Sequence, residues 1–200
     1  MAPARTPRSD TWGHDTELDA IAAQARSHPP LPPAELAPLL LEARAQPGGT
    51  ASGRLVEHHL TVALDEALAR RGRGVPVGDL YQEASIALVV AIEEYAAREG
   101  DAQGLRAYVD RVVALHLEAA LEKEATAVAA ELAMVRDTEL LSVAEVRLRR
   151  ELGRAATALE LGGLLMWPPE RVETVSAVLH QAQGQYDLEL LEFLDDVEDD

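Results

Sequence analysis

Apolar residues recur at helical spacing most clearly between residues 80 and 95. They follow one another there at intervals of one, three or four positions: Leu80, Ala84, Ala87, Leu88, Ala91, Ile92 and Tyr95. This spacing places them on one side of an α-helix, so we expect that side to be buried. Polar residues of the same segment fall outside the stripe and are available to solvent or to a partner: Gln82, Glu83, Ser85, Glu93 and Glu94.

Several other segments of the first two thirds of the chain also predict helices. We expect a short helix over residues 16–26, a break at the proline-rich stretch 29–33, and a helix over 34–45. A longer helix starts at Ser52 and ends before the glycines and proline of residues 71–76. Another long helix follows Gly100, and its apolar side, which His116 interrupts, comprises Leu105, Tyr108, Val109, Val112 and Ala119.

A second helical unit is predicted to begin near Ser142. Ser142 suits an N-cap, and Glu145 three positions later would complete a capping box. This helix should end at Gly153, and residues 156–166 and 169–183 then predict two helices joined by a short turn. Many helical hairpins share this helix-turn-helix-like outline. Since no segment shows sustained alternation of apolar and polar residues, we predict an all-α protein.

Composition and charge narrow the class of protein. The chain holds one Phe, two Trp, four Tyr and no Cys, so its core must consist mainly of Leu, Val and Ala, and disulfides are excluded. The net charge is −17, which disfavours strong binding to nucleic acid. Residues 1–186 contain 18 basic and 27 acidic residues, a net charge of −9. The remaining negative charge lies in the acidic tail at 187–200. That tail is either a solubilising segment or a functional one.

Motifs for catalysis or metal binding are missing from the sequence. There is no glycine-rich phosphate loop, no nucleophile elbow and no zinc-protease motif. His58 and His59 are adjacent, and on a helix they would point about 100° apart, so they suit packing better than a shared metal. We therefore expect no enzyme, no cofactor and no metal. No segment approaches membrane-spanning length, so we expect a cytoplasmic protein without a membrane partner.

Residues 54–60 and 70–88 resemble region 2 of the sigma-70 family of bacterial transcription factors. The matching runs are Arg-Leu-Val-Glu-His-His-Leu and Arg-Arg-Gly-Arg-Gly-Val-Pro-Val-Gly-Asp-Leu-Tyr-Gln-Glu-Ala-Ser-Ile-Ala-Leu. In that family the second run docks on the β′ clamp of core RNA polymerase. The resemblance implies a polymerase-binding set of Asp79, Gln82, Glu83, Ser85 and Val89. The alternative is that Asp79 only caps its helix while Gln82 and Glu83 are solvated.

The promoter-melting segment departs from the family pattern. Where that family has a Phe, a Tyr and two adjacent Trp, this chain has Leu105, Tyr108, Arg111 and Val112. Aromatic stacking contributes about 1 to 3 kcal/mol per base, so we expect any binding of promoter DNA through Tyr108 and Arg111 to be weak. Tyr108 also lies on the apolar stripe, which favours a place in the core.

Residues 150–161 and 169–172 resemble sigma region 3. This part of the chain carries the densest basic cluster: Arg147, Arg149, Arg150 and Arg154. The cluster suits phosphate contacts, or a solvated helix face paired with Glu145 and Glu151. The acidic tail more loosely resembles the linker that follows region 3, and we expect the family's region 4 to be absent.

These observations predict four parts in an all-α chain. Residues 1–33 form a mostly disordered segment with a short helix, 34–136 a sigma region 2-like bundle, 137–185 a smaller region 3-like three-helix unit, and 186–200 an acidic tail. The resemblance implies a sigma factor-like initiation protein that binds core RNA polymerase and recognises promoters weakly or in an altered way, with another transcription factor as a further candidate partner. The alternatives are a polymerase-binding regulator that competes with sigma factors, and a helical protein-interaction module.

Overall fold

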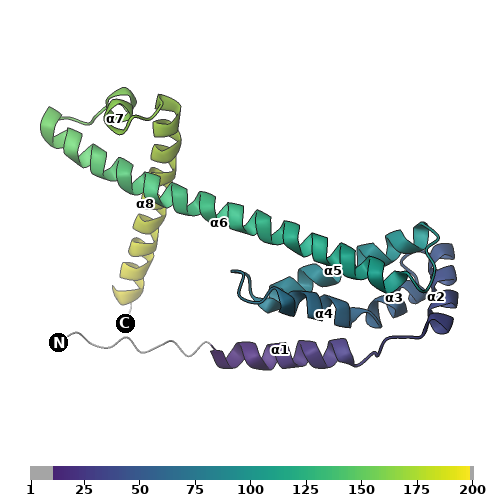
Figure 1. The fold of residues 1–200 in the computed structure, drawn as a ribbon. Helices are drawn as coiled ribbons and strands as arrows, with labels where there is room; N and C mark the ends of the chain where they lie inside the picture. Colours follow the sequence, from purple (N-terminus) through teal and green to yellow (C-terminus); the bar gives the residue numbers. More distant parts are fainter. Residues whose placement is uncertain (1–10, 199–200) are drawn as a thin grey trace. The chain divides into compact units, whose positions relative to one another are not determined.

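The computed structural model describes residues 11–198 and is all-helical over that range (Figure 1). This confirms the predicted fold class. Its helices are α1 Thr11–Arg26, α2 Pro33–Ala45, α3 Thr50–Glu57, α4 Leu60–Ala69, α5 Val77–Ala97, α6 Leu105–Leu152, α7 Ala158–Leu165 and α8 Pro169–Glu198. Residues 1–10 of the predicted disordered segment 1–33 lie outside the described residues, and the short helix predicted within it over 16–26 begins earlier, at Thr11.

The chain divides into two compact units between Ala125 and Thr126, nearer the N-terminus than the predicted boundary after residue 136. The first unit packs α2 to α5 and the start of α6 around one core. Leucine and alanine dominate this core, as the composition indicated, and eight of its alanines are at most 2% exposed: Ala43, Ala51, Ala63, Ala67, Ala84, Ala87, Ala91 and Ala96. Methyl-sized side chains allow neighbouring helices to approach closely.

The predicted single helix from Ser52 is wrong at one point, because the chain turns at His58 and His59 between α3 and α4. His59 has φ −116° and ψ 4°, outside the helical region, and its backbone N–H donates to Val56 O over 2.9 Å. Its ring is buried, and Nδ1 lies 2.7 Å from Leu55 O. His58 instead contacts Pro29 O through Nδ1 over 2.6 Å, so the two rings serve separate packing contacts.

The second unit contains the end of α6 together with α7 and α8. Its small core consists of Leu141, Ala144, Leu161, Val172 and Val175. The predicted N-cap at Ser142 is wrong, because α6 runs through this residue without interruption to Leu152. The predicted hairpin is confirmed, with Met166 in the left-handed conformation at the end of α7. Helix α8 extends beyond the predicted end at 183, through most of the acidic segment.

Candidate docking face on helix α5

The loop before α5 fixes where the helix begins. Gly72 and Gly74 have φ of 85° and 93°, values that favour glycine, and Pro76 is extended at φ −57° and ψ 145°. Pro76 N-caps the helix without a side-chain hydrogen bond, and Asp79 lies exposed in the first turn. Asp79 therefore makes no capping hydrogen bond and interacts with the helix end through its charge alone.

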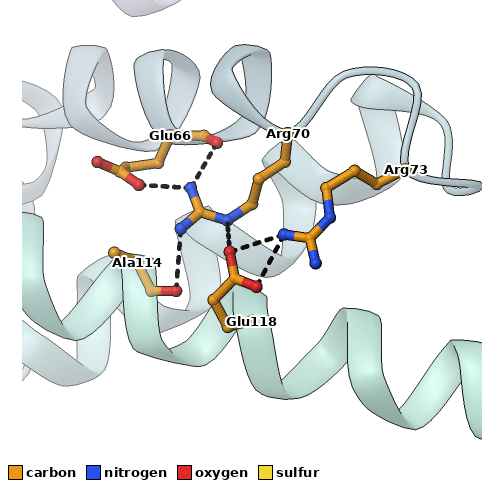
Figure 2. A network of polar contacts seen from close by, with 5 residues as sticks. All are labelled: Glu66, Arg70, Arg73, Ala114 and Glu118. Atoms are coloured by element: carbon orange, nitrogen blue, oxygen red, sulfur yellow. Dashed lines mark hydrogen bonds and ion pairs between the residues drawn. The ribbon is translucent and has the colours of Figure 1, made fainter.

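A polar network ties this loop to α6 (Figure 2). The Arg70 side chain, 11% exposed, donates to Glu66 O over 2.9 Å, to Ala114 O over 3.2 Å and to Glu118 Oε1 over 3.0 Å. Arg73 contacts both Glu118 oxygens, at 2.8 and 2.7 Å, and these contacts lower the pKa of Glu118. Arg70 and Arg73, at the start and in the middle of this loop, are thus both held to Glu118 of α6. These contacts position the start of α5.

The side of α5 opposite the core carries polar and apolar residues together. Leu80, Ala84, Leu88 and the rest of the predicted stripe are buried except Tyr95, which is half-buried. On the outer side, Ile86 is 57% exposed, Val90 49% and Val89 45%. At 100° per residue, six exposed residues span about 120° of the helix circumference. We call them the docking face: Asp79, Gln82, Glu83, Ile86, Val89 and Val90.

The structure places the predicted polymerase-binding residues differently within α5. Asp79, Gln82, Glu83 and Val89 belong to the docking face, whereas Ser85 is half-buried and donates through Oγ to Tyr81 O over 2.7 Å. The sequence prediction omitted Ile86 and Val90. They were detectable, because they are large apolar residues that fall outside the buried stripe at the same helical period.

Glu83 links the docking face to α6. His116 Nε2 lies 3.1 Å from Glu83 Oε2, and both side chains remain about half exposed. Beside this pair lies a groove of about 530 Å³ between the start of α5 and α6, and its polar lining comprises Asp79, Glu83, His116, Lys123 and Glu124. His116, which interrupts the apolar stripe of α6 in the sequence, therefore faces α5 from a half-exposed position.

The segment predicted from the resemblance to correspond to promoter melting holds one aromatic residue among Leu105, Tyr108, Arg111 and Val112. Leu105 is buried, Val112 is half-buried and Arg111 is exposed without an ion pair among the described residues. Tyr108 is half-buried, its ring centroid lies 5.0 Å from that of Tyr95, and its hydroxyl donates to Glu94 Oε2 over 2.8 Å. Burial and this hydrogen bond raise the pKa of Tyr108. Tyr108 packs against the core, as predicted, but keeps part of its surface exposed.

The predicted basic cluster is not one patch. Arg147, Arg149 and Arg150 lie on the last turns of α6, where Arg147 and Arg149 point about 160° apart. Arg147 pairs with Glu151 over 2.9 Å, while Arg149 and Arg150 are exposed.

Arg154 is engaged in the helix cap of α7 instead. It forms two hydrogen bonds with Glu160, at 3.0 and 2.7 Å, and Glu160 also completes a capping box with Thr157. The bonds from Arg154, followed by those from Thr157, lower the pKa of Glu160 to about 2. Arg154 therefore has a local structural partner that competes with any phosphate.

Neither a metal-binding group nor a membrane-spanning helix occurs in the part of the chain that the structure describes. No cluster of three His, Cys, Asp or Glu side chains is arranged to hold a metal ion there. No helix within the same residues is long and apolar enough to cross a membrane.

Comparison with family models and with curated proteins finds no match for this chain. No matching protein points to a functional site, so the candidate site is defined by the exposed residues of the docking face on α5.

Proposed function

We propose that this chain binds core RNA polymerase through the docking face of α5, as a sigma factor-like initiation protein. Two observations support the proposal: the resemblance of residues 54–60 and 70–88 to sigma region 2, and the exposed apolar residues at the centre of the implied contact surface. The second observation carries the proposal, because Ile86, Val89 and Val90 are far more exposed than the apolar residues of the opposite side.

The composition of the docking face suits a protein partner. Protein interfaces commonly combine an apolar centre with a polar rim, and here Ile86, Val89 and Val90 form the centre beside Asp79, Gln82 and Glu83. Two carboxylates at one end favour a partner helix with basic side chains, since charge-assisted hydrogen bonds fix its register. The Arg70 network adds to this fit by holding the start of α5 in place.

Promoter recognition by this protein is proposed to be weak. Tyr108 is the one aromatic residue of the promoter-melting segment, and its hydroxyl and one side of its ring are occupied by Glu94 and Tyr95. Flipping a base out of a duplex costs a few kcal/mol, which this surface has little stacking capacity to offset. The net charge of −17 opposes DNA binding further.

The limited stacking surface around Tyr108 also favours a second candidate function. A protein that docks on polymerase but captures promoter DNA poorly would occupy the sigma site without opening the promoter. Such a protein is a regulator that competes with sigma factors.

Docking is tested by a double substitution at the centre of the face. Ile86→Asp with Val90→Asp should reduce retention of core RNA polymerase on the immobilised chain by about 100-fold, a loss of roughly 3 kcal/mol. Leu41→Asp is the matched control, because Leu41 is 66% exposed on α2. Circular dichroism of both variants checks that the helices persist. Equal retention of polymerase by both variants, or none by the unsubstituted chain, would refute docking by this face and leave a helical interaction module.

In vitro transcription separates the two candidate functions. Addition of the chain to core polymerase alone should yield transcripts if it is an initiation factor. Addition to polymerase with a housekeeping sigma factor should lower transcript yield if it is a competitor, and the α5 double variant should not.

A further inference from the structure

Helix α6 has two apolar sides within the second unit, and only one of them is covered. Met134, Leu141, Ala144 and Leu148 face the small core formed with α7 and α8. On the opposite side, Val128 is 45% exposed, Leu132 65%, Val135 50% and Val146 57%. A helix with apolar residues on both sides is typical of one that contacts something on each.

The exposed side follows the repeat of a coiled coil. Its positions are spaced by four and three residues in alternation, and we call them the outer seam: Val128, Leu132, Val135, Glu139, Ser142 and Val146. Alternation of four and three is the average period of 3.5 that lets two helices pair along their length. In coiled-coil terms Leu132 is an a position and Val128 and Val135 are d positions.

The charged residues beside the outer seam are placed to form ion pairs with a parallel helix of the same sequence. Glu131 is a g position and Arg136 the e position five residues later, and Glu145 and Arg150 repeat this relation two heptads further on. In a parallel pair of helices, a g residue meets the e residue five positions later on the other helix. None of these four side chains forms an ion pair within the described chain, whereas the neighbouring Arg147 pairs with Glu151.

We propose that the outer seam binds a second copy of this chain in a parallel, in-register pair. Leu132 and Val135 then pack against the same residues of the second copy, and Glu131 pairs with Arg136 of the second copy in both directions. An antiparallel pair with the seams overlapped would instead bring Glu131 close to Glu145, another g position, which is repulsive. The self-complementary charge pattern thus identifies both the partner and its orientation.

Glu139 limits the strength of this dimer. It occupies an a position, so the pairing brings two carboxylates together in the middle of the seam. The dimer should therefore be reversible and concentration-dependent, and Glu139→Leu should strengthen it.

The oligomeric state of the full chain, without polymerase, tests the proposal and is independent of the docking experiment. In sedimentation velocity the mass should rise from the 21.6 kDa of one chain towards twice that value between about 1 and 500 µM, a range that spans weak association. Leu132→Glu should keep the chain monomeric throughout. Leu159→Glu is the matched control, since Leu159 is 74% exposed on α7, and it should leave the association unchanged. A mass of one chain at every concentration, for both the unsubstituted chain and Glu139→Leu, would overturn the proposal.

Orientation is tested by charge reversal and by cross-linking. Glu131→Arg and Arg136→Glu should each weaken the dimer about tenfold, and the two together should restore it. The chain has no cysteine, so Ser142→Cys provides a single thiol at a d position, which a parallel pair places opposite its own copy. Mild oxidation should then give a covalent dimer, whereas Ala177→Cys on the exposed surface of α8 should not. Equal cross-linking of the two variants would contradict the parallel arrangement.

Discussion

Arg70 and Glu118 join the end of α4 to α6 across 48 positions of sequence, with Arg70 Nε 3.0 Å from Glu118 Oε1. The guanidinium is nearly buried, and it also donates to Glu66 and to the carbonyl oxygen of Ala114 (Figure 2). One side chain thus connects α4, α6 and, through Arg73 on the shared Glu118, the loop that leads into α5.

Removal of the Arg70 side chain should destabilise the first unit. Arg70→Ala leaves the partly buried Glu66 carboxylate without its partner and opens a gap between α4 and α6, so we expect the free energy of unfolding to fall by about 3 kcal/mol. Arg73→Ala, at a half-exposed position, should cost much less. Urea denaturation followed by circular dichroism measures both losses, and equal losses would show that burial of Arg70 contributes nothing.

Stability should fall in mild acid because of His59. Burial is the main cause that lowers the pKa of His59 below 6.5, its value in the unfolded chain. Between those two pKa values the unfolded chain binds the proton and the folded chain does not, so the free energy of unfolding decreases as the pH drops below about 6.5. The full contribution is present above that pH.

The contribution of His59 is isolated by comparison with His59→Gln. The difference in the free energy of unfolding between the two proteins should change when the pH goes from 7.5 to 5.5. His58→Gln serves as the control, since His58 is only half-buried. An identical pH dependence in all three proteins would assign the acid sensitivity to other groups.

Aromatic residues added at the two family tryptophan positions should improve binding to single-stranded DNA. Arg111 is exposed and Val112 is half-buried, so Arg111→Trp with Val112→Trp adds stacking surface to this segment. Each stacked base contributes about 1 to 3 kcal/mol, which predicts a gain in affinity of at least about tenfold. Fluorescence anisotropy with a labelled oligonucleotide measures the gain, with Arg111→Ala as the control. If the double variant binds no better than Arg111→Ala, this segment does not lie on a strand-binding path.

The sequence predicted helix positions correctly where an apolar stripe was bounded by a residue that starts or ends helices. The stripe from Leu80 to Tyr95, preceded by Pro76, predicted α5 correctly. The turn at His58 and His59 was missed, because apolar spacing continues from Val56 to Leu60 while the backbone leaves the helical region at His59. Ser142 and Glu145 have the spacing of a capping box, but no glycine or proline interrupts the chain between Leu105 and Leu152, so the helix continues through them.

Side-chain partners were harder to predict than helices. Arg154 belongs to the predicted basic cluster, yet it follows the left-handed turn at Gly153 and contacts Glu160 of the next helix. Ser85 seemed free by helical phase but uses its hydroxyl on the backbone of its own helix. The predicted set came from the resemblance and so contained Val89 but not Ile86 or Val90. The position of Glu83 next to His116 depends on tertiary packing that no local pattern contains.

The alanine-rich contact between α4 and α5 restricts how this protein can change over time. A buried leucine can be replaced by a smaller or a similar side chain, but Ala63, Ala67, Ala84, Ala87 and Ala91 are already the smallest residues that favour a helix. Larger side chains there cost about 1 to 3 kcal/mol through overpacking, and glycine costs about 1 kcal/mol through backbone entropy. Tolerated substitutions should therefore accumulate at exposed positions and not at these five alanines. New binding specificities then arise at the exposed positions.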